Sequence, residues 1–120
     1  MTTRNEATTT IAISGGGVSG TLTAFHLAQQ KTQARVILID HRVGFGLGLA
    51  YSTPSLRHLL NVPAGKISAL PNQPTHFIDW LRRNHDSAAT EKTFAPRAIF
   101  GRYIQSLLKS ASHLEQEIAT

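Results

Sequence analysis

A glycine-rich turn placed between two short apolar runs is the feature that most restricts how this chain folds. Short runs of β-branched apolar residues form buried parallel strands, and glycines at the end of such a run allow the backbone to turn sharply into a helix. The second apolar run ends on an acidic residue, Asp40, twenty positions after the last glycine of the turn, Gly20. The order of these features predicts a βαβ unit with a strand over residues 10–14, a helix over about 18–30 and a strand over 36–39.

The glycines of the turn have separate predicted roles. Gly15 permits the tight turn, Gly17 leaves no side chain between the backbone and a pyrophosphate, and Gly20 lets the new helix pack closely on the strand. A pyrophosphate is expected to bind the unpaired N–H groups at the helix start, and Asp40 is placed to accept hydrogen bonds from a ribose diol. The alternative is an ordinary tight turn in which Asp40 only caps a strand. The agreement of glycine spacing, strand, helix and acidic residue favours the dinucleotide site.

Composition excludes several kinds of chemistry. The 120 residues contain no cysteine, so disulfides, thiolate catalysis and cysteine-ligated metals are ruled out. Six histidines are present, but none has the paired spacing of a metal-binding motif, and no metal site is predicted. The spacing of the remaining residues identifies neither a Ser/His/Asp set nor a pair of carboxylates, so no catalytic side chain is assigned.

The net charge of +5 does not by itself indicate a nucleic-acid-binding protein. The basic residues are scattered along the chain, and no RNA-recognition or zinc-finger pattern accompanies them. Such a surface instead favours an anionic cofactor. The chain shows neither an apolar signal segment at its start nor a run long enough to span a membrane. We therefore expect a cytoplasmic protein that contacts neither nucleic acid nor membrane.

The rest of the chain is expected to contain a long loop and two helices. Glycines and prolines interrupt residues 44–73, and loops of this length in compact domains usually serve a site, so we expect this one to cover the cofactor. Residues 74–83 begin with proline and place aromatic and leucine side chains on one face, which predicts an amphipathic helix. After a polar loop over 86–93, a second helix is predicted from 97 or 98 to about 112. The aromatic side chains of both helices are predicted to lie in the core.

Two strands are too few for a complete doubly wound domain. A two-stranded parallel sheet leaves unpaired edges and an uncovered apolar face. No strand is apparent after the last predicted helix, so the next parallel strand is expected to lie beyond Thr120. The sequence therefore predicts an α/β fold, with a Rossmann-like βαβ unit, additional helices and an incomplete doubly wound domain.

Further motifs resemble those of one group of nucleotide-binding proteins. Ala24 completes the flavin form of the glycine pattern, GxGxxGxxxA. The other matching segments are GGGVSG at 15–20, GLGLAY at 46–51, HLLNVPA at 58–64, PR at 96–97 and FGRY at 100–103. Over about residues 9–110 the chain resembles the flavin and nicotinamide dinucleotide-binding superfamily, and more narrowly the bacterial FAD/NAD(P)-binding proteins with GGGxSG and HLLNVPA segments. Asp40 departs from this pattern, because glutamate is commoner at its position in flavin proteins.

The resemblance implies FAD as the cofactor and NAD(P)H as a second dinucleotide. It implies the FAD-binding part of a flavin-dependent oxidoreductase, monooxygenase-like, that acts on a small-molecule substrate which the sequence does not identify. Residues 1–8 are expected to be a disordered tail, and residues 9–120 the N-terminal part of the FAD/NAD(P)-binding domain. The missing C-terminal portion is then a required partner, and the chain alone is not catalytically complete. The alternatives are a non-catalytic module that holds NAD, FAD or ADP, and a degenerate fragment.

The resemblance also extends the list of candidate site residues. Arg42 is expected beside the adenosine, with a solvated surface position as the alternative, and Asn61 beside the flavin ring, with loop hydrogen bonding as the alternative. His58 is expected to have a structural role. The candidate cofactor-binding residues are Gly15, Gly16, Gly17, Val18, Ser19, Gly20, Asp40, His41, Arg42 and Asn61.

Overall fold

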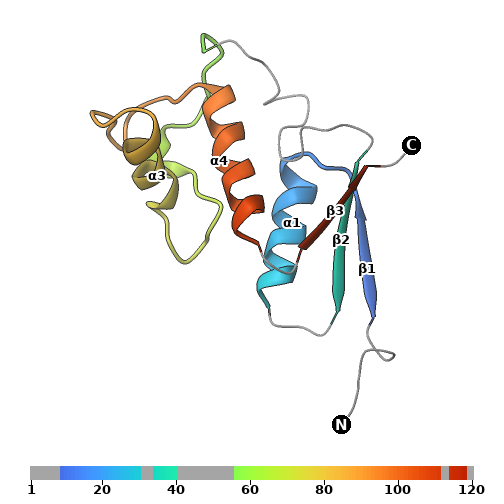
Figure 1. Cartoon of the computed structure of the whole chain (residues 1–120). Coiled ribbons are helices and arrows are strands. Elements are labelled where there is room, and N and C mark those ends of the chain that lie inside the picture. The colour runs from blue at the N-terminus through green and yellow to red at the C-terminus, as the bar shows by residue number, and fades with distance from the viewer. Residues whose placement is uncertain (1–8, 31–33, 41–55, 112–113, 119–120) are drawn as a thin grey trace.

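Three parallel strands and three helices make up the described part of the protein. The structure, a computed structural model, describes residues 9–30, 34–40, 56–111 and 114–118. Along the chain the elements are β1 (Thr10–Ser14), α1 (Val18–Gln29), β2 (Arg35–Asp40), a short 3-10 helix η2 (Ala64–Lys66), α3 (His76–Asn84), α4 (Arg97–Ser110) and β3 (Leu114–Ile118). Figure 1 shows the sheet, α1 against it, α4 beside α1 and α3 farthest from the strands. The predicted α/β fold with a βαβ unit and additional helices is confirmed.

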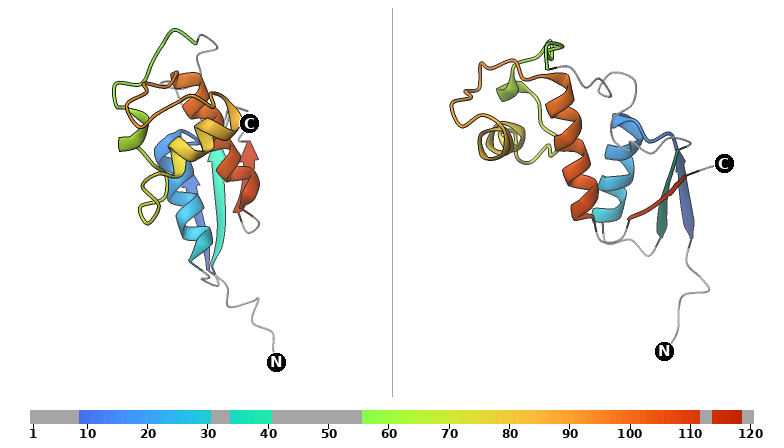
Figure 2. Two further views of the ribbon diagram at one scale, coloured as in Figure 1. Left: turned by 90° about the vertical axis from the view of Figure 1, so that its left-hand side faces the viewer. Right: turned by 45° about the horizontal axis from the view of Figure 1, so that its top comes forward.

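The sheet has the order β1-β2-β3, and both strand pairs are parallel. In this register Ile13 lies beside Leu38, and Val36 lies beside Leu114. These four side chains share one face of the sheet and pack with the buried Ala24 of α1. The two further views show α1 and α4 side by side, with their first turns at the same end of the molecule (Figure 2). That end is also where β1 and β2 finish and where the glycine turn lies.

The third strand corrects the expectation that the next parallel strand would lie beyond Thr120. Residues Leu114–Ile118 pair with β2 along its length. Their sequence, LEQEI, is mostly polar, and such residues are uncommon in strands. The pairing is supported from the solvent side, because Arg35 of β2 makes a two-pronged ion pair with Glu115 at 2.5 and 2.8 Å. The guanidinium of Arg35 also holds the pKa of the exposed Glu115 carboxyl below its usual value.

The larger part of the core lies between α3, α4 and the loop before them. Phe77, Phe100 and Tyr103 are buried there with ring centroids 4.8 to 5.5 Å apart, and Trp80 packs against them from a half-buried position. The prediction that these aromatic residues form core is therefore confirmed. The predicted helices are also confirmed, with slightly different ends.

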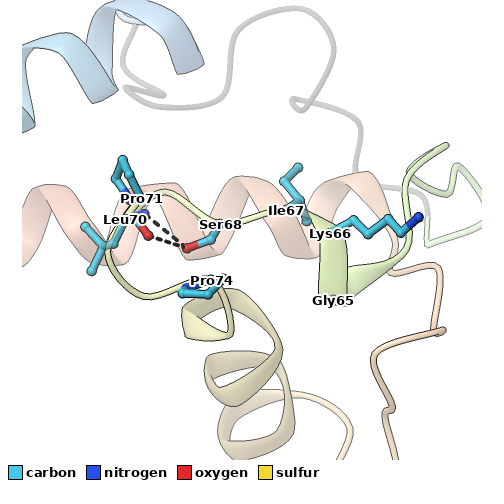
Figure 3. A pocket seen from close by; sticks show the side chains of 7 residues that line it. All are labelled: Gly65, Lys66, Ile67, Ser68, Leu70, Pro71 and Pro74. Carbon is cyan, nitrogen blue, oxygen red and sulfur yellow. Dashed lines mark hydrogen bonds between the residues drawn. The ribbon is translucent and has the colours of Figure 1, made fainter.

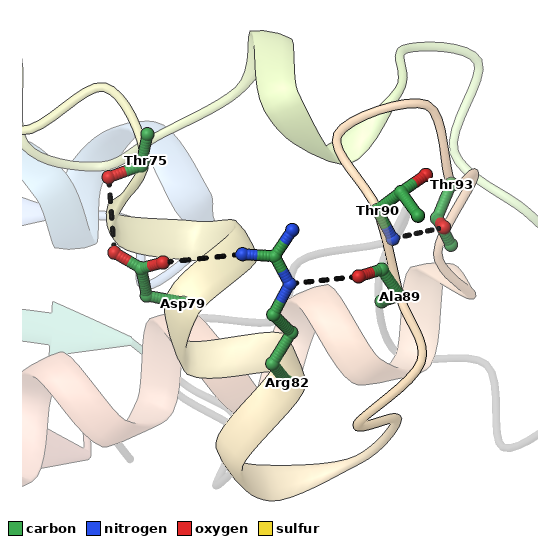
Figure 4. A network of polar contacts seen from close by, with 6 residues as sticks. All are labelled: Thr75, Asp79, Arg82, Ala89, Thr90 and Thr93. Carbon is green, nitrogen blue, oxygen red and sulfur yellow. Dashed lines mark hydrogen bonds and ion pairs between the residues drawn. The ribbon is translucent and has the colours of Figure 1, made fainter.

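A polar network joins α3 to the loop over 86–93 that follows it (Figure 4). Arg82 donates from Nε to the carbonyl oxygen of Ala89 at 2.8 Å, and its Nη1 lies 3.8 Å from a carboxylate oxygen of Asp79. The other oxygen of that carboxylate accepts a hydrogen bond from Thr75 Oγ1 at 3.1 Å. The bond to Ala89 is the one that ties the loop down, since exposed ion pairs contribute little to stability.

Tyr103 connects the helical part of the fold to the loop that precedes α3. Its side chain is fully buried, and its hydroxyl accepts a hydrogen bond from the N–H of Ala69 at 3.0 Å. His76 Nδ1 lies 2.7 Å from the same hydroxyl, and His26 of α1 holds the Ala69 carbonyl oxygen at 2.8 Å. Both polar groups of residue 69 are thus bound by side chains. Burial raises the pKa of Tyr103, although its hydrogen bonds to Ala69 and Ser68 oppose the shift.

Tyr103→Phe is expected to lower the free energy of unfolding by about 1–3 kcal/mol at neutral pH, because a buried N–H loses its acceptor. In the wild type the native state keeps the phenol proton to higher pH than the unfolded chain does. The stability from this group is therefore constant below about pH 10 and is lost as the pH rises above that value. Urea unfolding of both proteins between about pH 7 and pH 11 tests this, because the difference between them should narrow above pH 10. A difference that stays constant would contradict the assignment.

Candidate functional site

The backbone turn between β1 and α1 requires glycine at its first position. Gly15 has a φ of +110°, a conformation that side chains with a Cβ rarely adopt. Its N–H donates to the carbonyl oxygen of Ile39 at 2.8 Å, so the turn is bonded to the end of β2 as soon as β1 finishes. The tight turn that the sequence predicts at Gly15 is present in the structure.

Gly20 brings the first turn of α1 close to the glycine turn. A Cβ at residue 20 would lie only 1.9 Å from the carbonyl oxygen of Gly15 and 3.7 Å from Cγ2 of Ile13. The first of these neighbours is backbone, so it has no flexible side chain that could move away. The predicted close packing of the helix on the strand at Gly20 is therefore present, and it positions the N-terminus of α1 over the end of β1.

The N-terminus of α1 has the properties of an anion-binding site. The N–H groups of Val18, Ser19 and Gly20 lie in the first helical turn, where no intrahelical acceptor is available. Gly17 occupies the N-cap position without a side chain to cap the helix, and the first turn contains no acidic residue. No carboxylate of α1 therefore offsets the positive end of the helix dipole at its N-terminus.

Asp40 ends β2 with its carboxylate directed at the turn. The residue is only 7% exposed, and its Oδ2 accepts a hydrogen bond from the N–H of Gly16 at 2.7 Å. Two groups that the sequence analysis assigned separately to a ligand, Gly16 and Asp40, are thus bonded to each other. The N–H of Gly16 donates to the Asp40 carboxylate. The N–H groups from Val18 onward face the anion-binding position at the start of α1.

Thr21 is a residue of the site that the sequence analysis did not identify. It is fully buried, its N–H donates to the Gly17 carbonyl oxygen at 2.9 Å, and its Oγ1 donates to the Gly16 carbonyl oxygen at 3.3 Å. The available signal was a polar residue directly after Gly20, inside the predicted helix. A glycine pattern alone does not reveal it, because the pattern leaves that position unspecified.

The remaining candidate residues divide into two groups. His41, Arg42 and residues 44–55 of the expected cofactor-covering loop lie outside the described residues, whereas residues 56–73 of that loop are described. Asn61 and His58 are exposed in the described part. The backbone around His58 pairs with the start of α4, since the N–H of Arg97 donates to the His58 carbonyl oxygen at 2.7 Å and Leu60 donates to Ala95 at 2.8 Å. The segment therefore holds the N-terminus of α4 in place.

Two pockets lined by described residues lie away from the turn. One pocket of about 210 Å³ lies along residues 65–74, and its lining includes Lys66, Ser68 and Pro74 (Figure 3). A second, of about 410 Å³, lies between the C-terminal half of α1 and residues 70–73. Neither has a lining residue from the glycine turn or from β2. Within the described ranges no group of three His, Asp or Glu side chains is arranged to hold a metal ion, and no helix has the length and apolar character needed to cross a membrane.

Comparison with known proteins gives the family and the fold of this chain. A protein family described as FAD-NAD(P)-binding matches residues 12–119 of this chain. YdhS of Escherichia coli (strain K12), an uncharacterized protein, is 27% identical over 105 residues, which make up 79% of this chain and 20% of YdhS. The crystal structure of pqsL, a probable FAD-dependent monooxygenase from Pseudomonas aeruginosa, is similar with a TM-score of 0.50 and 14% identity over 92% of this chain and 32% of pqsL. At that identity the likeness shows the fold alone, and the chain spans only a minor part of either protein.

Proposed function

Because the chain belongs to the FAD-NAD(P)-binding family, we propose that it is the FAD-binding part of a flavin-dependent oxidoreductase that takes electrons from NAD(P)H. The observation that carries the proposal is the turn at which the buried Asp40 meets Gly16 beside the open N-terminus of α1. A backbone donor set next to a buried carboxylate suits a ligand that presents both a pyrophosphate and a ribose diol. FAD has both groups.

Each residue of the turn has a defined part in this proposal. The N–H groups of Val18 and Ser19 bind the pyrophosphate, and Gly17 leaves room for it. Asp40 accepts hydrogen bonds from the adenosine ribose while its carboxylate also holds Gly16. The flavin, when bound, supplies the hydride and electron transfer, so the chain itself needs to provide only binding and orientation.

The related proteins are much longer than this chain, so the whole enzyme is proposed to contain further segments. This chain spans 20% of YdhS and 32% of pqsL. We propose that residues 9–120 form the N-terminal part of the FAD-binding domain, and that a C-terminal portion supplies the nicotinamide and small-molecule substrate sites. We propose a monooxygenase-type reaction for the whole enzyme by analogy with the name of pqsL, a probable FAD-dependent monooxygenase.

Titration of the purified, folded chain with FAD tests the proposal, with flavin absorbance and fluorescence as readouts. Saturable binding of FAD, tighter than that of NADH or NADPH in parallel titrations, is the expected result. Preferential binding of NADH or ADP would instead support a non-catalytic nucleotide module. Failure of a folded chain to bind any of these ligands would overturn the proposal.

Asp40→Ala is expected to weaken FAD binding by about 1–3 kcal/mol, because the charge-assisted hydrogen bonds to the ribose are lost. The same substitution frees the N–H of Gly16. Asp40→Asn is the matched control, since its amide oxygen still accepts from Gly16 while the charge is removed. We expect its affinity for FAD to lie between those of wild type and Asp40→Ala. Equal affinity in all three proteins would place the ribose elsewhere.

A further inference from the structure

The peptide groups of the glycine turn are bonded on two sides. From β2, the Ile39 carbonyl oxygen accepts from the Gly15 N–H, and the Asp40 carboxylate accepts from the Gly16 N–H. From α1, Thr21 donates twice, through its N–H to the Gly17 carbonyl oxygen and through Oγ1 to the Gly16 carbonyl oxygen. The turn is therefore held between the end of β2 and Thr21, the fourth residue of α1.

Gly16 is the point where the two sides meet. Its N–H is bound by Asp40 at 2.7 Å and its carbonyl oxygen by Thr21 at 3.3 Å. In the described ranges, the buried polar and charged residues are Thr21, which is 0% exposed, and Asp40, which is 7% exposed. Buried polar side chains are retained where they satisfy a partner, and here both partners belong to one glycine.

The turn contains three consecutive glycines, Gly15, Gly16 and Gly17, which have no side chains to restrict their backbone. Glycine loses more conformational freedom on ordering than any other residue, and a ligand that orders a mobile turn binds more weakly by that amount. A turn already fixed in its bound shape avoids this loss. The position of the neighbouring N–H groups, from Val18 onward, depends on the conformation at Gly16.

We propose that Thr21 is a positioning residue for dinucleotide binding: its hydroxyl, together with the Asp40 carboxylate, clamps the Gly16 peptide and fixes the phosphate-binding turn before the ligand arrives. This inference rests on the proposed function for its ligand. The clamp itself is a property of the ligand-free chain.

Thr21→Val and Thr21→Ser separate the hydroxyl from the packing of the side chain. Valine keeps the shape and removes the hydroxyl, so we expect FAD affinity to fall by about 2- to 10-fold. Serine keeps the hydroxyl and removes a buried methyl group, so the melting temperature should fall while FAD affinity stays within about twofold of wild type. The opposite order, with weaker binding in Thr21→Ser than in Thr21→Val, would show a packing role only and overturn the proposal.

Hydrogen exchange of the Gly16 amide in the ligand-free chain provides a readout that does not depend on the cofactor. Slow exchange in the wild type that becomes faster in Thr21→Val, and is restored in Thr21→Ser, supports the clamp. Exchange that is equally fast in all three proteins overturns it. If the clamp is present by this measure but the wild type binds no FAD, the proposed function fails and the inference about the turn survives.

Discussion

Gly20→Ala is expected to lower the free energy of unfolding by about 3 kcal/mol or more, and the melting temperature by about 10 °C or more. The added Cβ would lie 1.9 Å from the Gly15 carbonyl oxygen, so α1 must move away from the turn. Alanine would favour a helix by only about 1 kcal/mol, which does not offset the clash. FAD binding should be lost together with stability, because both depend on how α1 meets the turn. Thermal unfolding followed by circular dichroism provides the measurement.

Two neighbouring substitutions serve as controls for this result. Gly15→Ala places a side chain in open space but at a φ of +110°, so only backbone strain of about 1–2 kcal/mol is expected. Thr23→Ala removes an exposed hydrogen bond to the Ser19 carbonyl oxygen and should change stability by less than about 0.5 kcal/mol. Gly20→Ala should therefore be the most damaging of the three. A larger loss in Gly15→Ala would mean that strain, and not close approach, dominates at the turn.

The sequence was sufficient to predict the βαβ unit because its local preferences and its final structure agree. The run over residues 10–14 is apolar and β-branched, and the turn residues Gly15 and Gly20 each meet a requirement that glycine alone satisfies. The amphipathic helices were predicted for the same reason, since their apolar spacing matches the helical period.

The third strand could not be predicted because its stability comes from its neighbour. Residues Leu114–Ile118 have weak strand preference, and they are a strand because β2 offers an unpaired edge and Arg35 can reach Glu115. Neither condition is visible in a local stretch of sequence. Local sequence preferences alone therefore predict that the segment is the end of a helix followed by a polar stretch.

The clamp on Gly16 was likewise beyond sequence analysis. Asp40 was correctly expected at the end of a strand, but its bond to Gly16 depends on the distance between two segments 24 residues apart. The role of Thr21 depends on which way one helical side chain points, and on the exact shape of the turn. Patterns of glycine spacing specify where a site lies, whereas the contacts that fix its shape come from packing.

Gly17→Val is expected to abolish saturable FAD binding while leaving the melting temperature close to that of wild type. Gly17 has a φ of −74° and a ψ of −171°, which is extended backbone that a β-branched residue adopts readily. The substitution therefore need not disturb the turn. Its side chain would instead stand at the N-cap of α1, where the proposed pyrophosphate approaches the N–H groups of Val18 and Ser19.

The value of Gly17→Val lies in its contrast with Gly20→Ala, since one should remove binding without unfolding and the other should remove both. Gly17→Ala is the graded control, because a single methyl group should weaken FAD binding without abolishing it. Circular dichroism and thermal unfolding establish that each variant is folded, and FAD titration then measures the affinity. Wild-type affinity in a folded Gly17→Val protein would place the pyrophosphate away from this turn, and the anion-binding role of the N-terminus of α1 would have to be abandoned.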